Sequence, residues 1–380
     1  MSNVISELVP IPIAQTKRVD IYSGMVRMTG KIYGQLVRPA DHKSETVIFL
    51  THPASAFLDH YLLRPLAEKG VHAFGMNTRY VGNDSSLIME NILPDIASAF
   101  RVLQEKGYKR FILIGNSGGA SLSCFYQAEA ENPSVTMTPG GEPVEIGKLV
   151  PADALIILAA HSGRARVFTE NLDPSITDER DPNSIDDALD MYNKKNGPPY
   201  SKQFLERYRE AQFKRNRRIT QWCKDQIAAR KGLLPAGVNP GFMVHRTFAE
   251  PAYLDLSIEP TERGTCHTFG DPERYNLDGA GLGRYTTHHS WLSQWSYDES
   301  RADGVKQLPR TSVPVHVIQP TADEMVLPHH PQSLFDAVKH KNKIYTDVRG
   351  ATHYPKPGTP ALAAIVDTIV GWVKEKKLAA

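Results

Sequence analysis

Runs of consecutive apolar residues recur along the chain, and each is rich in β-branched or aromatic side chains. The clear runs cover 46–53, 72–79, 110–117, 153–161 and 313–320, with a weaker one at 342–350. An unbroken apolar run of this length is typical of a strand buried on both faces, as in a parallel sheet. Residues 24–38 instead alternate apolar and polar positions around glycines, which predicts an early hairpin or meander.

Between these runs, apolar residues recur at spacings of three and four, which predicts amphipathic helices. These segments cover 57–69, 89–106, 118–130, 332–340 and 360–375. Regular alternation of strands and helices is typical of βαβ units. The sequence therefore predicts an α/β fold with a mostly parallel central sheet flanked by helices.

One segment, 162–310, breaks the alternation. It contains no clear series of strands, but 204–232 has the pattern of a long helix. Structureless loops longer than ~15 residues are uncommon inside compact domains. We therefore predict a large, mainly helical cap inserted at 162–310, with 1–161 and 311–380 forming the core.

The strand predicted at 110–117 ends in the letters GNSGG, and a stretch of small residues follows. A G-x-S-x-G pattern between a strand and a helix is typical of a turn that presents a nucleophilic serine. Gly115 and Gly119 would let the turn close, and Ser117 would stand at its tip. The alternative is a glycine-rich turn whose serine only caps the helix. A Walker phosphate loop is disfavoured, because no G-K-[ST] follows.

A serine hydroxyl needs a base, and the base needs an acid to orient it. In this topology both partners follow later strands, in the order serine, acid, histidine. Asp323 stands directly after the strand predicted at 313–320, and His353 stands after the one at 342–350. Glu324 is a rival for the acid. These positions lie at the carboxyl edge of the sheet, where open α/β sheets place their sites.

Four segments carry a resemblance to the α/β-hydrolase family: THPASAF (51–57), GNSGG (115–119), PTADEMV (320–326) and GATHYPKPG (350–358). The resemblance covers roughly 1–161 and 311–380. It implies acyl transfer, with Ser117 as nucleophile, His353 as general base and then acid, and Asp323 as the orienting carboxylate.

The family also implies an oxyanion hole, which binds the negative charge of the tetrahedral intermediate. One donor would be the amide of Gly118. The other would come from the loop after the strand at 46–53, where family members often have His-Gly-x and this chain has a proline. Pro53 has no N–H to donate. We therefore expect Ala54 to donate, with Ser55 as the alternative.

Charge and composition add exclusions. The 44 basic and 42 acidic residues give a formal net charge of +2, so nothing in the charge favours nucleic acid or an acidic membrane as a partner. The three dispersed cysteines form no disulfide framework, and no apolar run approaches the ~18 residues of a membrane span. The N-terminus lacks the pattern of a secretory signal. We expect a cytoplasmic protein.

We predict neither a metal nor a cofactor. The adjacent pairs His288-His289 and His329-His330 are the obvious metal candidates, but neighbouring side chains diverge on a helix or a strand. Residues expected to line a substrate pocket are His161 and Tyr80, which follow predicted strands, and Trp291. Trp295 lies four positions after Trp291, on the same face of a helix, although simple packing of cap on core explains such a pair equally well.

A serine nucleophile indicates attack on a carbonyl carbon. The sequence therefore predicts hydrolysis of a carboxylic ester or related acyl compound of small, partly apolar character. Three alternatives remain open: hydrolysis of a carbon–carbon bond in a diketone-like substrate, acyl transfer to an alcohol or amine, and ligand binding without catalysis. The oligomeric state is also open, a homodimer included.

Overall fold

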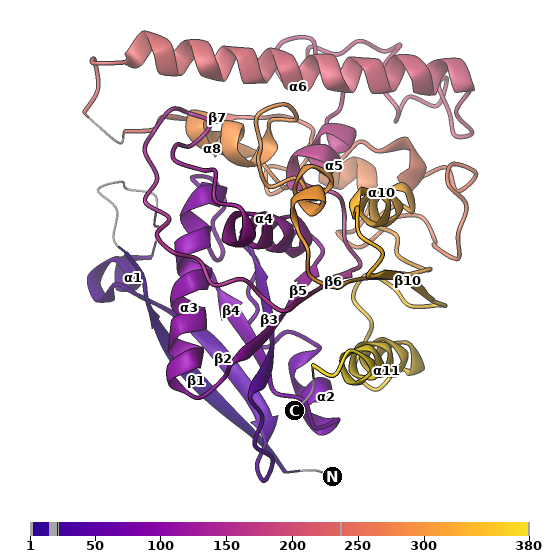
Figure 1. Ribbon diagram of the computed structural model, residues 1–380. Helices are drawn as coiled ribbons and strands as arrows, with labels where there is room; N and C mark the ends of the chain where they lie inside the picture. Colours follow the sequence, from indigo (N-terminus) through magenta and orange to yellow (C-terminus); the bar gives the residue numbers. More distant parts are fainter. Residues whose placement is uncertain (1–2, 15–20, 22, 236–237, 379–380) are drawn as a thin grey trace.

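The computed structural model describes residues 3–14, 21, 23–235 and 238–378, and within them eight strands form one sheet (Figure 1). The strand order is β1-β2-β4-β3-β5-β6-β9-β10. At one edge, β2 runs antiparallel to both β1 and β4, and the remaining neighbours are parallel. The strands are β1 (Val4–Pro12), β2 (Lys31–Pro39), β3 (Thr46–His52), β4 (Ala73–Asn77), β5 (Arg110–Asn116), β6 (Ala154–Leu158), β9 (Val315–Pro320) and β10 (Lys343–Val348). The mostly parallel α/β sheet predicted from the apolar runs is confirmed.

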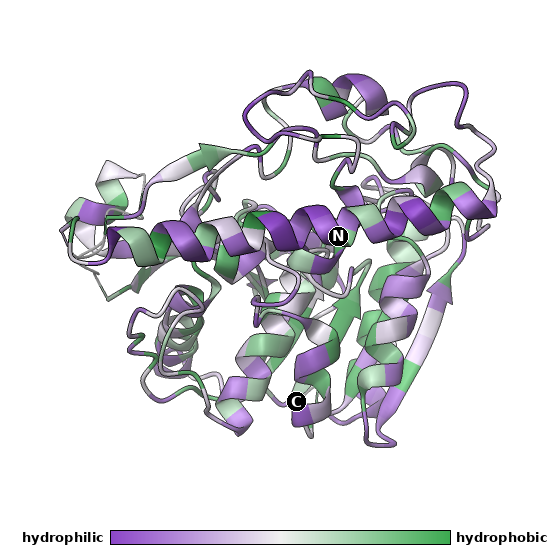
Figure 2. Ribbon diagram, turned by 90° about the horizontal axis from the view of Figure 1, so that it is seen from above, coloured by the Kyte–Doolittle hydropathy of each residue, from purple (hydrophilic) through white to green (hydrophobic). Residues whose placement is uncertain are grey.

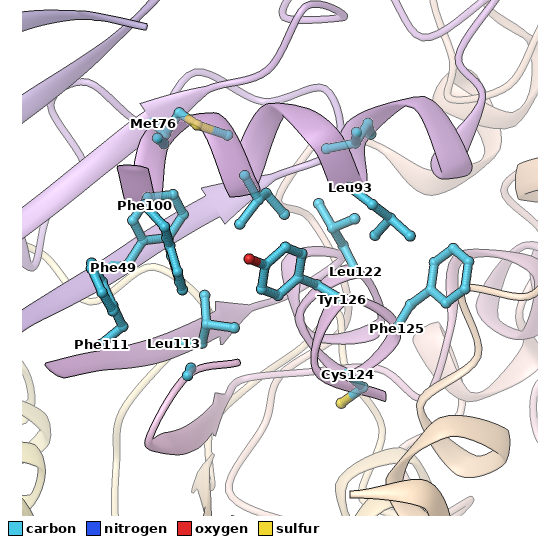
Figure 3. Close-up of a cluster of buried hydrophobic side chains, with 14 of the residues drawn as sticks. Phe49, Met76, Leu93, Phe100, Phe111, Leu113, Leu122, Cys124, Phe125 and Tyr126 are labelled. Atoms are coloured by element: carbon cyan, nitrogen blue, oxygen red, sulfur yellow. The ribbon is translucent and has the colours of Figure 1, made fainter. Parts of the chain in front are cut away.

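Both faces of the sheet are covered, which explains the unbroken apolar runs. All of β3 is buried, and its alternate side chains enter different cores: Phe49 lies on one side and Leu50 on the other. The first core is closed by α3 (Leu93–Glu105), α4 (Gly119–Glu131) and α10 (His329–Ala337). The second is closed by α2 (Leu63–Glu68) and α11 (Pro360–Glu375). In the first core the rings of Phe100 and Phe111 stack at 4.1 Å (Figure 3).

The N-terminal region differs from the prediction. Residues 24–29 form helix α1 (Gly24–Thr29), so the hairpin predicted at 24–38 is wrong in its first part. The partner of β2 is β1, which the sequence pattern did not predict because prolines interrupt it. Prolines are tolerated in an edge strand, where no neighbour needs their missing N–H groups.

The segment between β6 and β9 carries the large insertion. Its main helix, α6 (Lys202–Arg230), crosses the top of the molecule in Figure 1, and Figure 2 shows that hydrophilic residues alternate with shorter hydrophobic stretches along it. The prediction of a helix at 204–232 is confirmed to within two residues at each end. Its shorter elements are α5 (Arg164–Asn171), β7 (Gly241–Met243), α7 (Pro272–Leu277), β8 (Tyr285–Thr287), α8 (His288–Ser290) and α9 (Gly304–Gln307), with single 3-10 or π turns at 251–253, 291–295 and 308–310. A further 3-10 turn at 89–92 precedes α3 in the core.

Two further expectations concern the whole chain. The three cysteines are buried and unpaired, so they form no disulfide framework. Among the described residues, no helix has the length and apolar character needed to cross a bilayer.

Candidate active site

Ser117 stands in a sharp turn between β5 and α4. Its φ of +53° lies in the left-handed region that non-glycine residues rarely adopt, so the backbone there is strained. The glycines around it are required by close backbone contacts. A Cβ on Gly115 would lie 2.3 Å from the Cα of Ala120, and one on Gly119 would lie 2.4 Å from the carbonyl oxygen of Thr51. Any side chain at either position would therefore open the turn.

The structure brings Ser117, His353 and Asp323 together in one line of hydrogen bonds. The distance from His353 Nε2 to Ser117 Oγ is 3.1 Å, and that from His353 Nδ1 to Asp323 Oδ2 is 2.8 Å. The second carboxylate oxygen of Asp323 accepts the backbone N–H groups of Met325 and Val326, each at 2.9 Å. Because the buried carboxylate can only accept, His353 donates its Nδ1–H and leaves Nε2 free to take a proton from the serine.

The rival acid, Glu324, points elsewhere. Its carboxylate accepts a hydrogen bond from the hydroxyl of Thr268 in the inserted segment. Asp323 is therefore the carboxylate in contact with the histidine.

The loop after β3 differs from the expected oxyanion loop. The amides of Ala54 and Ser55 both donate to Nδ1 of His52, at 3.1 and 2.9 Å. Both loop amides therefore have an acceptor inside the loop, and the assignment of Ala54, or of Ser55 as the alternative, stays a prediction that requires the amide to exchange this acceptor for the oxyanion.

The two hydrogen bonds from the loop amides determine which ring nitrogen of His52 carries the proton. Its Nδ1 accepts from both amides and so carries no proton, while burial lowers the pKa of the ring well below its usual range and keeps it neutral. The proton must then be on Nε2. A Cβ added to Gly118 would lie 2.7 Å from this nitrogen. An N–H donor of His52 thus lies directly beside the residue that follows the nucleophile.

His161, which follows β6, lies beside the same glycine. Its Nε2 would be 3.4 Å from the added Cβ of Gly118. Burial lowers its pKa well below the usual range, and its Nδ1 has no hydrogen-bond partner among the described residues. This imidazole lines the cavity above the serine.

A cavity of about 780 Å³ opens above Ser117 and His353, between the sheet edge and the inserted segment. Its floor is polar, whereas its walls are largely aromatic. The aromatic side chains on its lining are Phe168, Phe248, Tyr253, Phe269, Tyr275, Tyr285, Trp295 and Tyr354. Such a cavity suits a ligand with a substantial apolar part.

Two residues expected in the pocket are not on its lining. Tyr80 is buried in the core beneath the sheet edge. Trp291 is fully buried inside the insertion, where its indole N–H donates to Thr220 Oγ1 at 3.0 Å, and Trp295 lines the cavity in its place. Both indole rings contact Phe168, so the two tryptophans share one face of the π turn at 291–295, but only Trp295 lies on the lining of the cavity.

Sequence reasoning missed a charged group in the cavity wall. Arg164 begins α5, stacks over Trp295 at 4.3 Å, and bonds Asp84 Oδ2 at 2.6 Å. Its Nε is buried and has no partner among the described residues. The loop 279–283 also lines the cavity. Neither feature lies in one of the four motif segments, so neither carried a signal in the sequence.

The paired histidines differ in their surroundings. His288 stacks on Phe242, and His289 lies 3.1 Å from a carboxylate oxygen of Glu142. In contrast, the rings of His329 and His330 approach to 4.0 Å, and both contact one carboxylate. The premise that adjacent histidines diverge is wrong for this second pair.

No protein-family model matches the chain, and no curated protein matches it by sequence. Solved structures do. The α/β hydrolase GrgF from Penicillium sp. sh18 is 12% identical, with 98% of each chain covered and a TM-score of 0.54. DcsB, solved with a substrate analogue, is 13% identical, with 98% of this chain and 99% of that chain covered and a TM-score of 0.50. At such identity the likeness concerns architecture alone, and it agrees with the strand order and the turn at Ser117: this chain has the α/β-hydrolase fold.

Proposed function

We propose that the protein is a serine hydrolase that cleaves a carboxylic ester, or a related acyl compound, through an acyl-Ser117 intermediate. The observation that supports this most directly is the unbroken line of hydrogen bonds from Asp323 through His353 to Ser117. A line with this order of acid, imidazole and hydroxyl is what nucleophilic catalysis by serine requires.

In the first half-reaction, Ser117 Oγ attacks the carbonyl carbon while its proton moves to His353 Nε2. Asp323 stabilises the imidazolium that forms. The tetrahedral intermediate then collapses: the bond to the leaving alcohol breaks, and His353 returns the proton to the alcohol oxygen. In the second half-reaction water takes the place of the serine hydroxyl, and the acid is released.

We assign the oxyanion hole to the amide of Gly118 and to Nε2–H of His52. Two observations support the second donor: the loop amides hold the opposite ring nitrogen as an acceptor, and the donor nitrogen lies beside Gly118. A neutral buried imidazole that is already oriented needs no rearrangement when the oxyanion forms. The side chain of His52 would thus take the role of a backbone donor from this loop, because the amides of Ala54 and Ser55 donate to His52 itself.

The inserted residues 162–310 would act as a cap over the core formed by 1–161 and 311–380. The aromatic walls favour a substrate with an apolar part, while Arg164 favours one that also carries a hydrogen-bond acceptor. The cavity of about 780 Å³ is large enough for a small or medium-sized molecule.

The test is labelling with a fluorophosphonate, followed by a panel of esters of increasing acyl size. We expect wild type to be labelled at one serine and Ser117→Ala to resist. A wild-type protein that resists labelling as fully as this variant would reject the catalytic proposal and favour ligand binding alone. Product analysis then separates the other candidates: free acid and alcohol indicate an esterase, transferred acyl product an acyltransferase, and cleavage of a diketone a carbon–carbon hydrolase.

A further inference from the structure

A cluster of two histidines and one glutamate joins the insertion to the core behind the cavity wall. Glu170 lies on α5, while His329 and His330 begin α10. The Nε2 atoms of both histidines approach the same carboxylate oxygen, Glu170 Oε2, at 3.3 and 3.0 Å. When one ligand atom is taken from each residue, these three atoms all lie within 4.8 Å of one another.

These separations fit a metal ion. Zinc is bound by imidazole nitrogen and carboxylate oxygen at about 2.0 Å in a tetrahedron, whose edges are then about 3.3 Å long. The two nitrogen-to-oxygen distances of 3.3 and 3.0 Å correspond to such edges. Three protein ligands would leave the fourth corner to water.

The opposite nitrogen of each ring is also held in place. Nδ1 of His329 lies 2.6 Å from Glu259 Oε1, and Nδ1 of His330 lies 3.1 Å from Ser162 Oγ. Histidines that ligate a metal characteristically use their second nitrogen in this way, because the bond fixes the tautomer and aims the free lone pair. If each ring donates its Nδ1–H outward, both Nε2 lone pairs face a carboxylate oxygen, and a cation bound between them would relieve the repulsion.

The charge of the cluster favours the same occupant. Glu170 and Glu259 bring two carboxylates, and neither forms an ion pair with a lysine or arginine within the described part of the chain. Arg209 lies near Glu170, but its guanidinium pairs with Glu250 and donates to the backbone oxygen of Glu170 rather than to its carboxylate. A divalent cation would balance both carboxylates.

An ion can also reach the cluster. His329 is partly exposed and lies on the lining of a separate cavity of about 570 Å³, which open surface residues such as Thr261 and Glu262 also border. This route does not pass through the cavity above Ser117.

We propose that Glu170, His329 and His330 form a zinc site that fastens helix α5 to helix α10. The role is structural, and it does not depend on the proposed hydrolase activity. Since Val167, Phe168 and Asn171 of α5 line the large cavity, the ion would hold that wall in position above the serine.

The experiment uses the full chain after treatment with a chelator. We expect titration with Zn²⁺ to show one ion bound per chain, and the bound ion to raise the melting temperature. Co²⁺ in place of Zn²⁺ should give the visible absorption spectrum of a tetrahedral site. Glu170→Gln should weaken zinc binding at least 10-fold, and Glu259→Gln by about 10- to 100-fold through loss of the outer hydrogen bond. His289→Gln, in the other histidine pair, is the matched control and should bind as wild type does.

The Co²⁺ spectrum of the wild-type protein needs no variant, so it remains informative if Glu170→Gln fails to fold. Absence of stoichiometric zinc binding, or binding that Glu170→Gln leaves unchanged, would overturn the proposal. In that case protons, shared between the imidazoles and the carboxylates, would hold the cluster together.

Discussion

Replacing His52 by asparagine tests which group stabilises the oxyanion. The amide oxygen of asparagine occupies nearly the place of the imidazole Nδ1, so it can still accept the N–H groups of Ala54 and Ser55. It has no atom at the place of Nε2, so the donor beside Gly118 is lost. The change therefore removes the proposed catalytic donor and leaves the hydrogen bonds of the loop in place.

Loss of one oxyanion donor typically lowers kcat by about 10²–10³, which is ~2.7–4 kcal/mol of transition-state stabilisation. We expect this loss for His52→Asn, with KM little changed, because the oxyanion exists only in the transition state and the intermediate. The assay is steady-state hydrolysis of a chromogenic ester that the wild type accepts, with a melting curve for each variant.

His52→Gln is the complementary variant. Its amide nitrogen reaches nearly the place of Nε2, but nothing replaces the Nδ1 acceptor, so the amides of Ala54 and Ser55 lose their partner. We expect higher kcat but a lower melting temperature than for His52→Asn. If instead the Ala54 amide were the true donor, His52→Asn would leave that donor and its hydrogen bond in place, and kcat would stay within a factor of about three of wild type. That result would refute the assignment of His52.

Further predictions concern the triad, a helix and the acid stability of the fold. Asp323→Asn should lower kcat by about 10⁴, since the histidine would lose the acceptor that fixes its tautomer, while Glu324→Gln, whose partner lies in the insertion, should stay near wild type in the same ester assay. Gly371→Ala, in the exposed face of α11 with open space around the added Cβ, should raise the free energy of unfolding in urea by about 0.5–1 kcal/mol. Burial lowers the pKa of His60 to about 4. Between about pH 6.5 and pH 4 this imidazole is therefore protonated in the unfolded chain but neutral in the folded chain. Stability should therefore fall as the pH drops from 6.5 towards 4, and urea titrations of His60→Gln at pH 7 and pH 5 should show a smaller fall than wild type; an equal fall would assign the acid sensitivity to other groups.

The sequence was most informative where chemistry and topology act together. A parallel sheet buried on both faces requires unbroken apolar runs, and those runs are what identified β3 to β6 and β9. Ser117, Asp323 and His353 follow from the same reasoning, since each comes just after a strand and the carboxyl ends of the strands share one edge.

The sequence was less informative where local contacts decide the outcome. Ala54 was assigned as a donor by its place in the loop, and the structure shows that its amide donates to the ring of His52. Trp291 was expected on the pocket wall, but only Trp295 reaches the cavity, and Trp291 packs inside the insertion. The contacts of Arg164 and of the cluster at Glu170 link residues far apart in the chain, and a single sequence gives no sign of such contacts.

Two features of the chain, Pro53 in the oxyanion loop and the glycine at the unconstrained position 118 of the G-x-S-x-G pattern, have one explanation if His52 is the donor. The proline cannot supply an amide, and the ring that replaces it leaves no room for a side chain at 118, where a Cβ would meet Nε2 at 2.7 Å. Gly118→Ala should therefore lower kcat by displacing His52. In a His52→Asn background the same change should cost much less, since the donor is already gone. If the two effects on kcat simply multiply in the double variant, Gly118 serves the turn alone and the link to His52 is refuted.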